Sequence, residues 1–263
     1  MNRTESLQEN PNPIDVGLKT IGIETPSDKL SSLEKLVSLV IAYNSHTNLI
    51  ADASPEIIRS RHILDSLSAL QFWPDVLDSA SDKKTLSLVD LGSGAGFPGL
   101  VLAIWIENLN VTLVDSNRKK IRFLEEAAAA LELGKRVKTV HARLEELGRD
   151  PAFRGRFDLV SARALGHLAL NAELGLPLLK RGGKSLFYKT EKQAKEEAPV
   201  LNSMLESLGG GEIEYLVPVI QEGNSKHILI RIEKLNRGSD SFPRSWKNIK
   251  RDLERYKTGA KSG

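Results

Sequence analysis

Two segments in the first third of the chain carry apolar residues at the three- and four-residue steps of an amphipathic helix. The first begins at the capping pair Ser27-Asp28, and the second begins at Ser54-Pro55-Glu56, where a proline fits the first helical turn. Their apolar positions are Leu30, Leu33, Leu36, Val37, Val40 and Ile41, then Ile57, Ile58, Ile63, Leu64 and Leu67. A polar run from Asp78 to Asp82 follows. We therefore expect a helical subdomain over residues 27–80.

The periodicity changes after this polar run, because short β-type runs there alternate with helical segments. The seven runs are Leu86–Leu91, Val111–Asp115, Val137–His141, Phe157–Ser161, Lys184–Lys189, Ile213–Val219 and Lys226–Ile232. Segments long enough for crossover helices separate the first five, which predicts a parallel sheet with helices on both faces. Only Ile220–Ser225 separates the last two, which suits an antiparallel hairpin. Residues 81–235 are therefore predicted to form one α/β domain with the strand inventory of a Rossmann-like methyltransferase sheet, since dinucleotide dehydrogenases usually continue with parallel units.

The two ends of the chain depart from this pattern. Residues 1–26 are polar, contain prolines and lack periodicity, which predicts a loose leader. At the other end, Arg231–Gly263 holds ten Lys and Arg against four Asp and Glu, which leaves +6 where the whole chain has +3. We separate residues 236–263 as a basic C-terminal tail, which is either a solvated, poorly ordered end or a contact for nucleic acid.

The composition excludes several kinds of chemistry. The chain has 263 residues, 40% of them hydrophobic, and no Cys, which rules out disulfides, thiolate metal sites and cysteine nucleophiles. No stretch approaches about 18 uninterrupted apolar residues, and the first residues lack the basic and apolar regions of a signal peptide. We therefore expect a cytoplasmic protein that acts without a metal ion and without a membrane.

The strongest local signal is the glycine-rich loop that joins the first strand to an apolar helix. Its glycines, Gly92, Gly94 and Gly96, follow the spacing G-x-G-x-G, whereas dinucleotide sites use G-x-G-x-x-G. Asp90 precedes the first glycine by two residues, where it can hold the strand-to-loop geometry or face a cationic ligand. Pro98 begins the helix. Since glycines let the backbone come close to a ligand, the loop favours S-adenosylmethionine (AdoMet), with an NAD-type dinucleotide and a purely structural turn as the alternatives.

Two acidic residues follow the next strands at the same predicted edge of the sheet. Asp115 ends the second strand, where its carboxylate can accept hydrogen bonds from two ribose hydroxyls or cap the following helix. The third strand leads to Ala142-Arg143-Leu144-Glu145, whose backbone would lie near an adenine ring. Glu145 could equally act as an acid at a helix N-terminus.

These residues belong to six ordered motifs that resemble the bacterial 16S rRNA guanine-N7 methyltransferases, also called glucose-inhibited division protein B. The motifs are Arg61–Ser66, Asp90–Gly99, Val114–Ser116 with Lys119–Leu124, Ala142–Glu145, Ser161–Ala164 and Tyr188-Lys189. The resemblance spans about Leu30 to Ile232. It departs from the family at Phe97 and Ser93, where Leu and Thr are more usual, and in the longer leader. Phe242-Pro-Arg244 is similar to a basic ending found in part of the family.

The resemblance implies a class I AdoMet-dependent methyltransferase that modifies N7 of a guanine, guanine 527, in 16S rRNA or the small ribosomal subunit. Carried over position by position, the cofactor contacts would be Gly92, Phe97, Leu144, Glu145 and Arg163, with Asp115 added. Arg163 would bind the cofactor or position the guanine, and its alternative is a surface ion pair.

The chemistry that the resemblance implies needs no general base, because guanine N7 carries an exposed lone pair at neutral pH. His62 is the one histidine inside a motif, as a substrate contact or as a hydrogen-bonded helix residue. Four basic residues could contact rRNA phosphates, although such residues also occur on solvated helix faces: Arg118, Lys119, Arg122 and Lys189. The competing functions are methylation of another substrate, a non-catalytic RNA-binding module and, on weaker grounds, an oxidoreductase.

Overall fold

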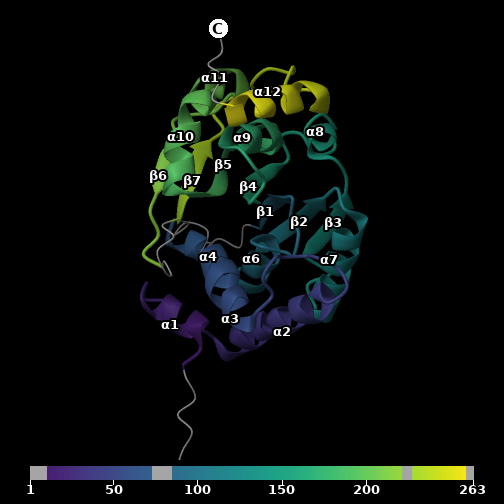
Figure 1. Ribbon diagram of the computed structural model, residues 1–263, viewed down its shortest axis with the longest axis vertical. Helices are drawn as coiled ribbons and strands as arrows, with labels where there is room; N and C mark the ends of the chain where they lie inside the picture. Colours follow the sequence, from purple (N-terminus) through teal and green to yellow (C-terminus); the bar gives the residue numbers. More distant parts are fainter. Residues whose placement is uncertain (1–10, 73–84, 221–226, 259–263) are drawn as a thin grey trace, which may run out of the picture.

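A seven-stranded sheet lies between two layers of helices in the computed structural model, which describes residues 11–72, 85–220 and 227–258 (Figure 1). The strands are β1 Leu86–Leu91, β2 Leu109–Asp115, β3 Val137–His141, β4 Phe157–Arg163, β5 Leu179–Thr190, β6 Glu214–Leu216 and β7 His227–Glu233. The helices and helical turns are α1 Pro13–Lys19, α2 Ser27–Asn44, α3 Pro55–Ile57, η1 Ile58–Leu64, α4 Asp65–Leu67, η2 Ser68–Phe72, α6 Gly99–Trp105, α7 Arg118–Ala130, α8 Leu144–Leu147, α9 Leu168–Gly175, η4 Leu176–Leu178, α10 Glu191–Asn202, α11 Leu205–Leu208 and α12 Trp246–Thr258.

The strand order is β3-β2-β1-β4-β5-β7-β6, with β1 to β5 parallel and β7 antiparallel to both of its neighbours. This order confirms the predicted parallel sheet with an antiparallel C-terminal pair, and the fold is that of a Rossmann-like methyltransferase. The fifth strand begins at Leu179, earlier than predicted, because its register against β4 shifts after Phe157 and a glycine pair, Gly182-Gly183, interrupts the apolar pattern. None of the helices in the described ranges is long and apolar enough to span a bilayer.

Each face of the sheet packs against its own helices. In β1 the alternation of side chains places Leu88 in one hydrophobic cluster, and Val89 and Leu91 in the other. Helices α1, α2, α6 and α7 cover the first face, and α8 to α12 cover the second (Figure 1). Burial on both sides explains why successive positions of β1, Leu88 and Val89, are both apolar.

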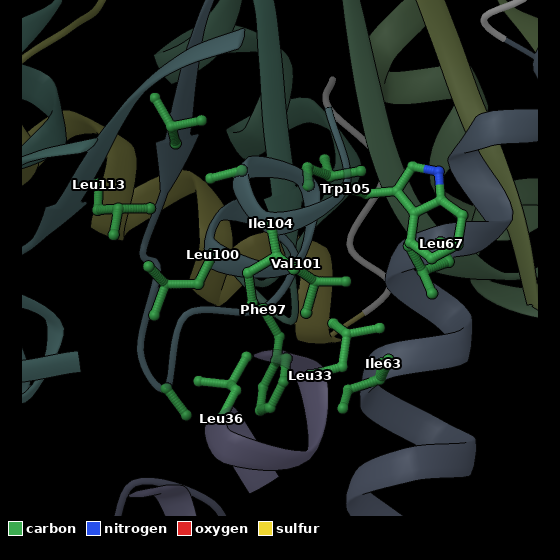
Figure 2. Close-up of a cluster of buried hydrophobic side chains, with 14 of the residues drawn as sticks. Leu33, Leu36, Ile63, Leu67, Phe97, Leu100, Val101, Ile104, Trp105 and Leu113 are labelled. Carbon is green, nitrogen blue, oxygen red and sulfur yellow. The ribbon is translucent and has the colours of Figure 1, made fainter. Parts of the chain in front are cut away.

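The N-terminal helices share the core of the sheet domain. Leu33 of α2 and Ile63 of η1 lie with Leu100 of α6 in one buried cluster (Figure 2). The predicted subdomain is therefore a layer of the same domain over the residues described, and its expected end near Ala80, with the polar run Asp78–Asp82, lies outside them.

The prediction of a loose leader is wrong for the part of it that the structure describes. Asn12 caps α1 by accepting a hydrogen bond from the backbone N–H of Ile14 at 2.9 Å, and its amide donates to Glu34 at 2.6 Å. Ile14 and Leu18 of α1 are fully buried. Two buried apolar residues in one short helix give too weak a periodicity to recognise, so packing against η1 decides this segment.

The C-terminal segment is also docked, which corrects the alternative of a poorly ordered tail over its described part. Ile249 of α12 is 2% exposed, and Arg244 pairs with the buried Glu173 of α9. Arg149 donates from Nε to the carbonyl of Pro243 at 2.8 Å. Residues 236–254 therefore lie across α8 and α9 as part of the second helical layer.

Candidate active site

The carboxyl ends of the parallel strands bring the predicted site residues to one edge of the sheet. The glycine loop follows β1, Asp115 ends β2, and Arg163 ends β4. Because β7 runs antiparallel, its first residue, His227, pairs with Thr190 at the end of β5. Ligands of open α/β sheets bind at this edge, where the chain order reverses between β1 and β4.

The glycine loop adopts a backbone that side chains would obstruct. Gly92, Gly94 and Gly96 have φ angles of +67°, +56° and +87°, in the left-handed region that L residues rarely occupy. A Cβ atom at Gly92 would lie 2.8 Å from Leu165 Cδ1, and one at Gly96 would lie 2.5 Å from Leu100 Cδ1. The loop therefore offers bare backbone at the end of β1, as a close-fitting ligand requires.

Asp90 stabilises the loop from below. Its fully buried carboxylate accepts hydrogen bonds from Ser161 Oγ at 2.7 Å and from the backbone N–H of Gly99 at 3.2 Å. Burial raises the pKa of Asp90 to about 6. Of its two expected roles, these contacts support the one in which it holds the strand-to-loop geometry.

Asp115 retains acceptor capacity beside the loop. Its Oδ2 accepts from the backbone N–H of Gly94 at 3.1 Å, and its Oδ1 accepts from Asn117 N at 2.8 Å. The residue that caps α7 is Asn117, which accepts from Lys119 N, so Asp115 is not the helix cap. Each carboxylate oxygen has a second lone pair, which suits the two vicinal hydroxyls of a ribose. The residues present therefore fit AdoMet at this position.

Of the other expected cofactor contacts, Glu145 and Leu144 lie together in α8, whereas the side chain of Phe97 points into the core. Glu145 lies in the first turn of α8, is 9% exposed and stands 3.6 Å from Arg143, while Leu144 is half-buried beside it. Phe97 turns its side chain away from the loop, stacks on His62 with ring centroids 5.0 Å apart, and points toward Leu36 in the core (Figure 2). Only the backbone of Phe97 therefore lies at the loop.

A cleft of about 1060 Å³ opens over the ends of β4 and β5 and the start of β7, and of the expected cofactor contacts only Arg163 lines it. Arg163, Ala164 and Leu165 form one wall of it, and Leu165 brings this wall next to the glycine loop at Gly92. Trp246 also lines the cleft. Within the described ranges there is no group of three or more His, Asp or Glu residues that could hold a metal ion. We refer to this cavity as the cleft.

Arg163 joins the sheet edge to the N-terminal helices, which brings together two of the motifs recognised in the sequence. Its guanidinium donates to His62 Nδ1 at 2.7 Å, to the carbonyl of Arg61 at 2.5 Å and to Asp65 Oδ2 at 3.1 Å. Arg61 and His62 lie in η1, a π-helical turn of a kind frequent at functional sites. The hydroxyl of Tyr188 donates to the carbonyl of Ser66 at 3.0 Å. The ion pair of Arg163 is thus part of the cleft wall.

His62 is not placed to act as a base. Burial, and then the charge of Arg163, lower its pKa to about 4, so its ring is neutral near pH 7. Since a guanidinium can only donate, Nδ1 accepts from Arg163 and the ring proton is on Nε2. The one lone pair of the ring that could take a proton is already used.

The four predicted phosphate contacts separate into two groups. Arg118, Lys119 and Arg122 lie exposed on α7, outside the cleft, without an ion pair among the described residues. Lys189 is buried, donates to the carbonyl of Gly166 and to Glu197 Oε2, and has its pKa lowered by burial. Lys189 is therefore not an exposed contact for phosphate, because its ammonium is bonded to the loop after β4 and to Glu197.

Asp65 and His227 are among the cleft residues that were not singled out from the sequence. Asp65 lies within a recognised motif, and its Oδ1 is 3.4 Å from Nδ1 of His227, whose pKa burial lowers. His227 lies at the end of the recognised region and carries no local signal. Their pairing depends on β7 lying beside β5.

Comparison with known proteins agrees with this geometry. Residues 29–229 match the family described as rRNA small subunit methyltransferase G. The protein of that name from Lachnoclostridium phytofermentans is 38% identical over 242 residues, covering 92% of this chain and 96% of the relative. Its namesake from Caldicellulosiruptor bescii is 35% identical over 236 residues, covering 90% and 97%. The chain therefore belongs to the rRNA small subunit methyltransferase G family and is an AdoMet-dependent methyltransferase.

Proposed function

We propose that the enzyme methylates N7 of a guanine in 16S rRNA, at position 527, by in-line transfer without a general base. The family name supports ribosomal RNA of the small subunit as the substrate. The observation that supports N7 as the methylated atom is the protonation and hydrogen bonding of the histidine in the cleft wall. This histidine, His62, is neutral and has its acceptor nitrogen occupied by Arg163. Such a wall suits a nucleophile that already has a free lone pair.

The residues of the chain bind and orient the reactants. When bound, AdoMet supplies an electrophilic methyl group. Gly92 and Asp115 hold the cofactor side, because one permits backbone approach and the other accepts ribose hydroxyls. Arg163 is fixed by three hydrogen bonds, which places a rigid wall where the guanine enters. The catalytic effect is then one of proximity and orientation.

The test uses purified enzyme, labelled AdoMet and two transcripts of the target region of 16S rRNA. One transcript contains guanine throughout, and the other contains 7-deazaguanine, which has carbon in place of N7. We expect label only in the first, mapped to the target guanine. Equal labelling of both transcripts would show that another atom is methylated. Binding of both transcripts without any label transfer would support the non-catalytic RNA-binding module.

A further inference from the structure

A second cavity, of about 720 Å³, lies at the opposite edge of the sheet from the cleft. It is formed by the loop before β4, the start of β5 and the segment after β7. Six basic residues line it: Arg149, Arg154, Lys180, Arg181, Lys234 and Arg237. We call this cavity the basic pocket.

The positive charge of the basic pocket is only partly compensated. Asp240 is the ion-pair partner of two of the arginines, since it lies 2.9 Å from Arg237 and 3.5 Å from Arg154. Lys180 pairs with Asp158 at 3.0 Å. The other three basic residues, Arg149, Arg181 and Lys234, have no carboxylate within ion-pair distance in the part of the chain that the structure describes. The pocket therefore carries an excess of cations.

Lys234 is the most informative of these cations, because it is 2% exposed and yet faces no carboxylate. Its ammonium donates one hydrogen bond, to the carbonyl of Leu208 at 2.5 Å, and has two further N–H donors. Burial, and then the charge of Arg154, lower the pKa of Lys234 to about 8. Buried charges are normally paired, so a lysine kept here next to an arginine indicates an anionic partner.

A third cavity, of about 360 Å³, lies over α8 and shares one lining residue with the cleft and one with the basic pocket. Trp246 lines both the cleft and this third cavity, and Arg149 lines both the third cavity and the basic pocket. Lys180 and Lys189, near the two ends of β5, are nine residues apart, so the two sites are roughly 30 Å from each other. A small substrate cannot reach both, whereas an extended polyanion can.

We propose that the basic pocket binds a backbone phosphate of the same RNA chain whose guanine enters the cleft. This inference rests on the proposed function. Contacts to phosphates fix the register of a nucleic acid without reading its sequence, so the pocket would act as a distal anchor. The docked C-terminal segment would then serve RNA binding by forming one wall of the track.

The experiment compares three variants with the wild-type enzyme: Arg181→Ala, Lys234→Met and, as a matched control, Lys135→Ala. Lys135 is an exposed lysine in the turn before β3, outside the basic pocket. Binding of the 16S rRNA transcript is measured by filter binding at several salt concentrations, and AdoMet binding is measured by calorimetry. We expect each pocket variant to lose about threefold or more in rRNA affinity, with a salt slope shallower by about 0.7 to 0.9. Lys135→Ala should match the wild type in both, and AdoMet affinity should stay constant.

Unchanged affinity and slope in Arg181→Ala and Lys234→Met would overturn the proposal, while the proposed function stands if the wild type still methylates the transcript. Arg181 is exposed, so its variant remains informative even where Lys234→Met fails to fold. A wild-type enzyme that neither binds nor methylates the transcript would instead refute the proposed function. Tight binding of inorganic phosphate, with equal rRNA affinity in all variants, would assign the pocket to a free anion and overturn the RNA anchor.

Discussion

The ion pair between Arg244 and Glu173 tests whether the segment after β7 is part of the folded domain. The side chain of Glu173 is 2% exposed. Arg244 donates three hydrogen bonds to it, from its backbone N–H at 2.7 Å, from Nε at 2.9 Å and from Nη2 at 2.7 Å. Arg244→Met would keep the aliphatic stem and remove the charge. The carboxylate of Glu173 would then be buried with one backbone donor left.

Removing one partner of a buried ion pair costs about 3–5 kcal/mol, because the remaining charge is uncompensated. A domain has a free energy of unfolding of about 5–15 kcal/mol, so Arg244→Met should remove a large part of it. Glu173→Gln should cost less, about 1.5–3 kcal/mol, since Arg244 keeps Asp252 at 2.5 Å and is itself 26% exposed. The double variant should be less destabilised than the two single variants together.

The assay is urea unfolding followed by circular dichroism and fluorescence, with Arg237→Ala as the control. Arg237 lies in the same segment, but its ion pair with Asp240 is exposed, so its loss should cost at most about 1 kcal/mol. If Arg244→Met costs no more than Arg237→Ala, or if the effects of Arg244→Met and Glu173→Gln simply add, the segment is not held by this pair and the reasoning is wrong.

Three further results are expected. Gly92→Val and Asp115→Ala should each lower AdoMet affinity about tenfold or more in calorimetry. The valine would obstruct the approach of the cofactor to the backbone, and the alanine would remove charged acceptors. Wild-type affinity in both folded variants would contradict the cofactor site. The single-turnover methylation rate should be level between about pH 6 and 8, since the pKa of His62 is about 4, and a tenfold fall per pH unit below neutrality would instead indicate a base. The folded pKa of His62 is depressed from 6.5, so the unfolded chain binds this proton first, and the contribution of His62 to the free energy of unfolding should fall by about 3 kcal/mol as the pH drops from 6.5 to 4. Because the raised pKa of Asp90 acts in the opposite direction over the same range, the effect is measured as the difference between urea titrations of the wild type and of His62→Phe.

Local patterns in the sequence were sufficient for the type of sheet, although not for every strand boundary, since β5 begins at Leu179 and not at Lys184. The strand Leu86–Leu91 was predicted with the bounds that β1 has, and the short connection before His227 predicted an antiparallel pair. The docked ends of the chain were not predictable in the same way. Ile14 in α1 and Ile249 in α12 are buried only because distant helices cover them, and neither segment has enough apolar residues to show this in its own periodicity.

The class of the protein could be inferred from the amino-acid sequence, because the glycine loop and the five other motifs are local patterns that occur in a fixed order along the chain. The pairing of polar residues, in contrast, follows from the packing of distant segments. Arg163 reaches Asp65, 98 residues earlier in the chain, and this contact depends on how the first helical layer packs under β4. Lys189 has the same charge as the exposed Lys119 of α7, yet the loop after β4 and Glu197 enclose it. Charge and motif are encoded along the chain, whereas burial and pairing arise from packing between segments far apart in it.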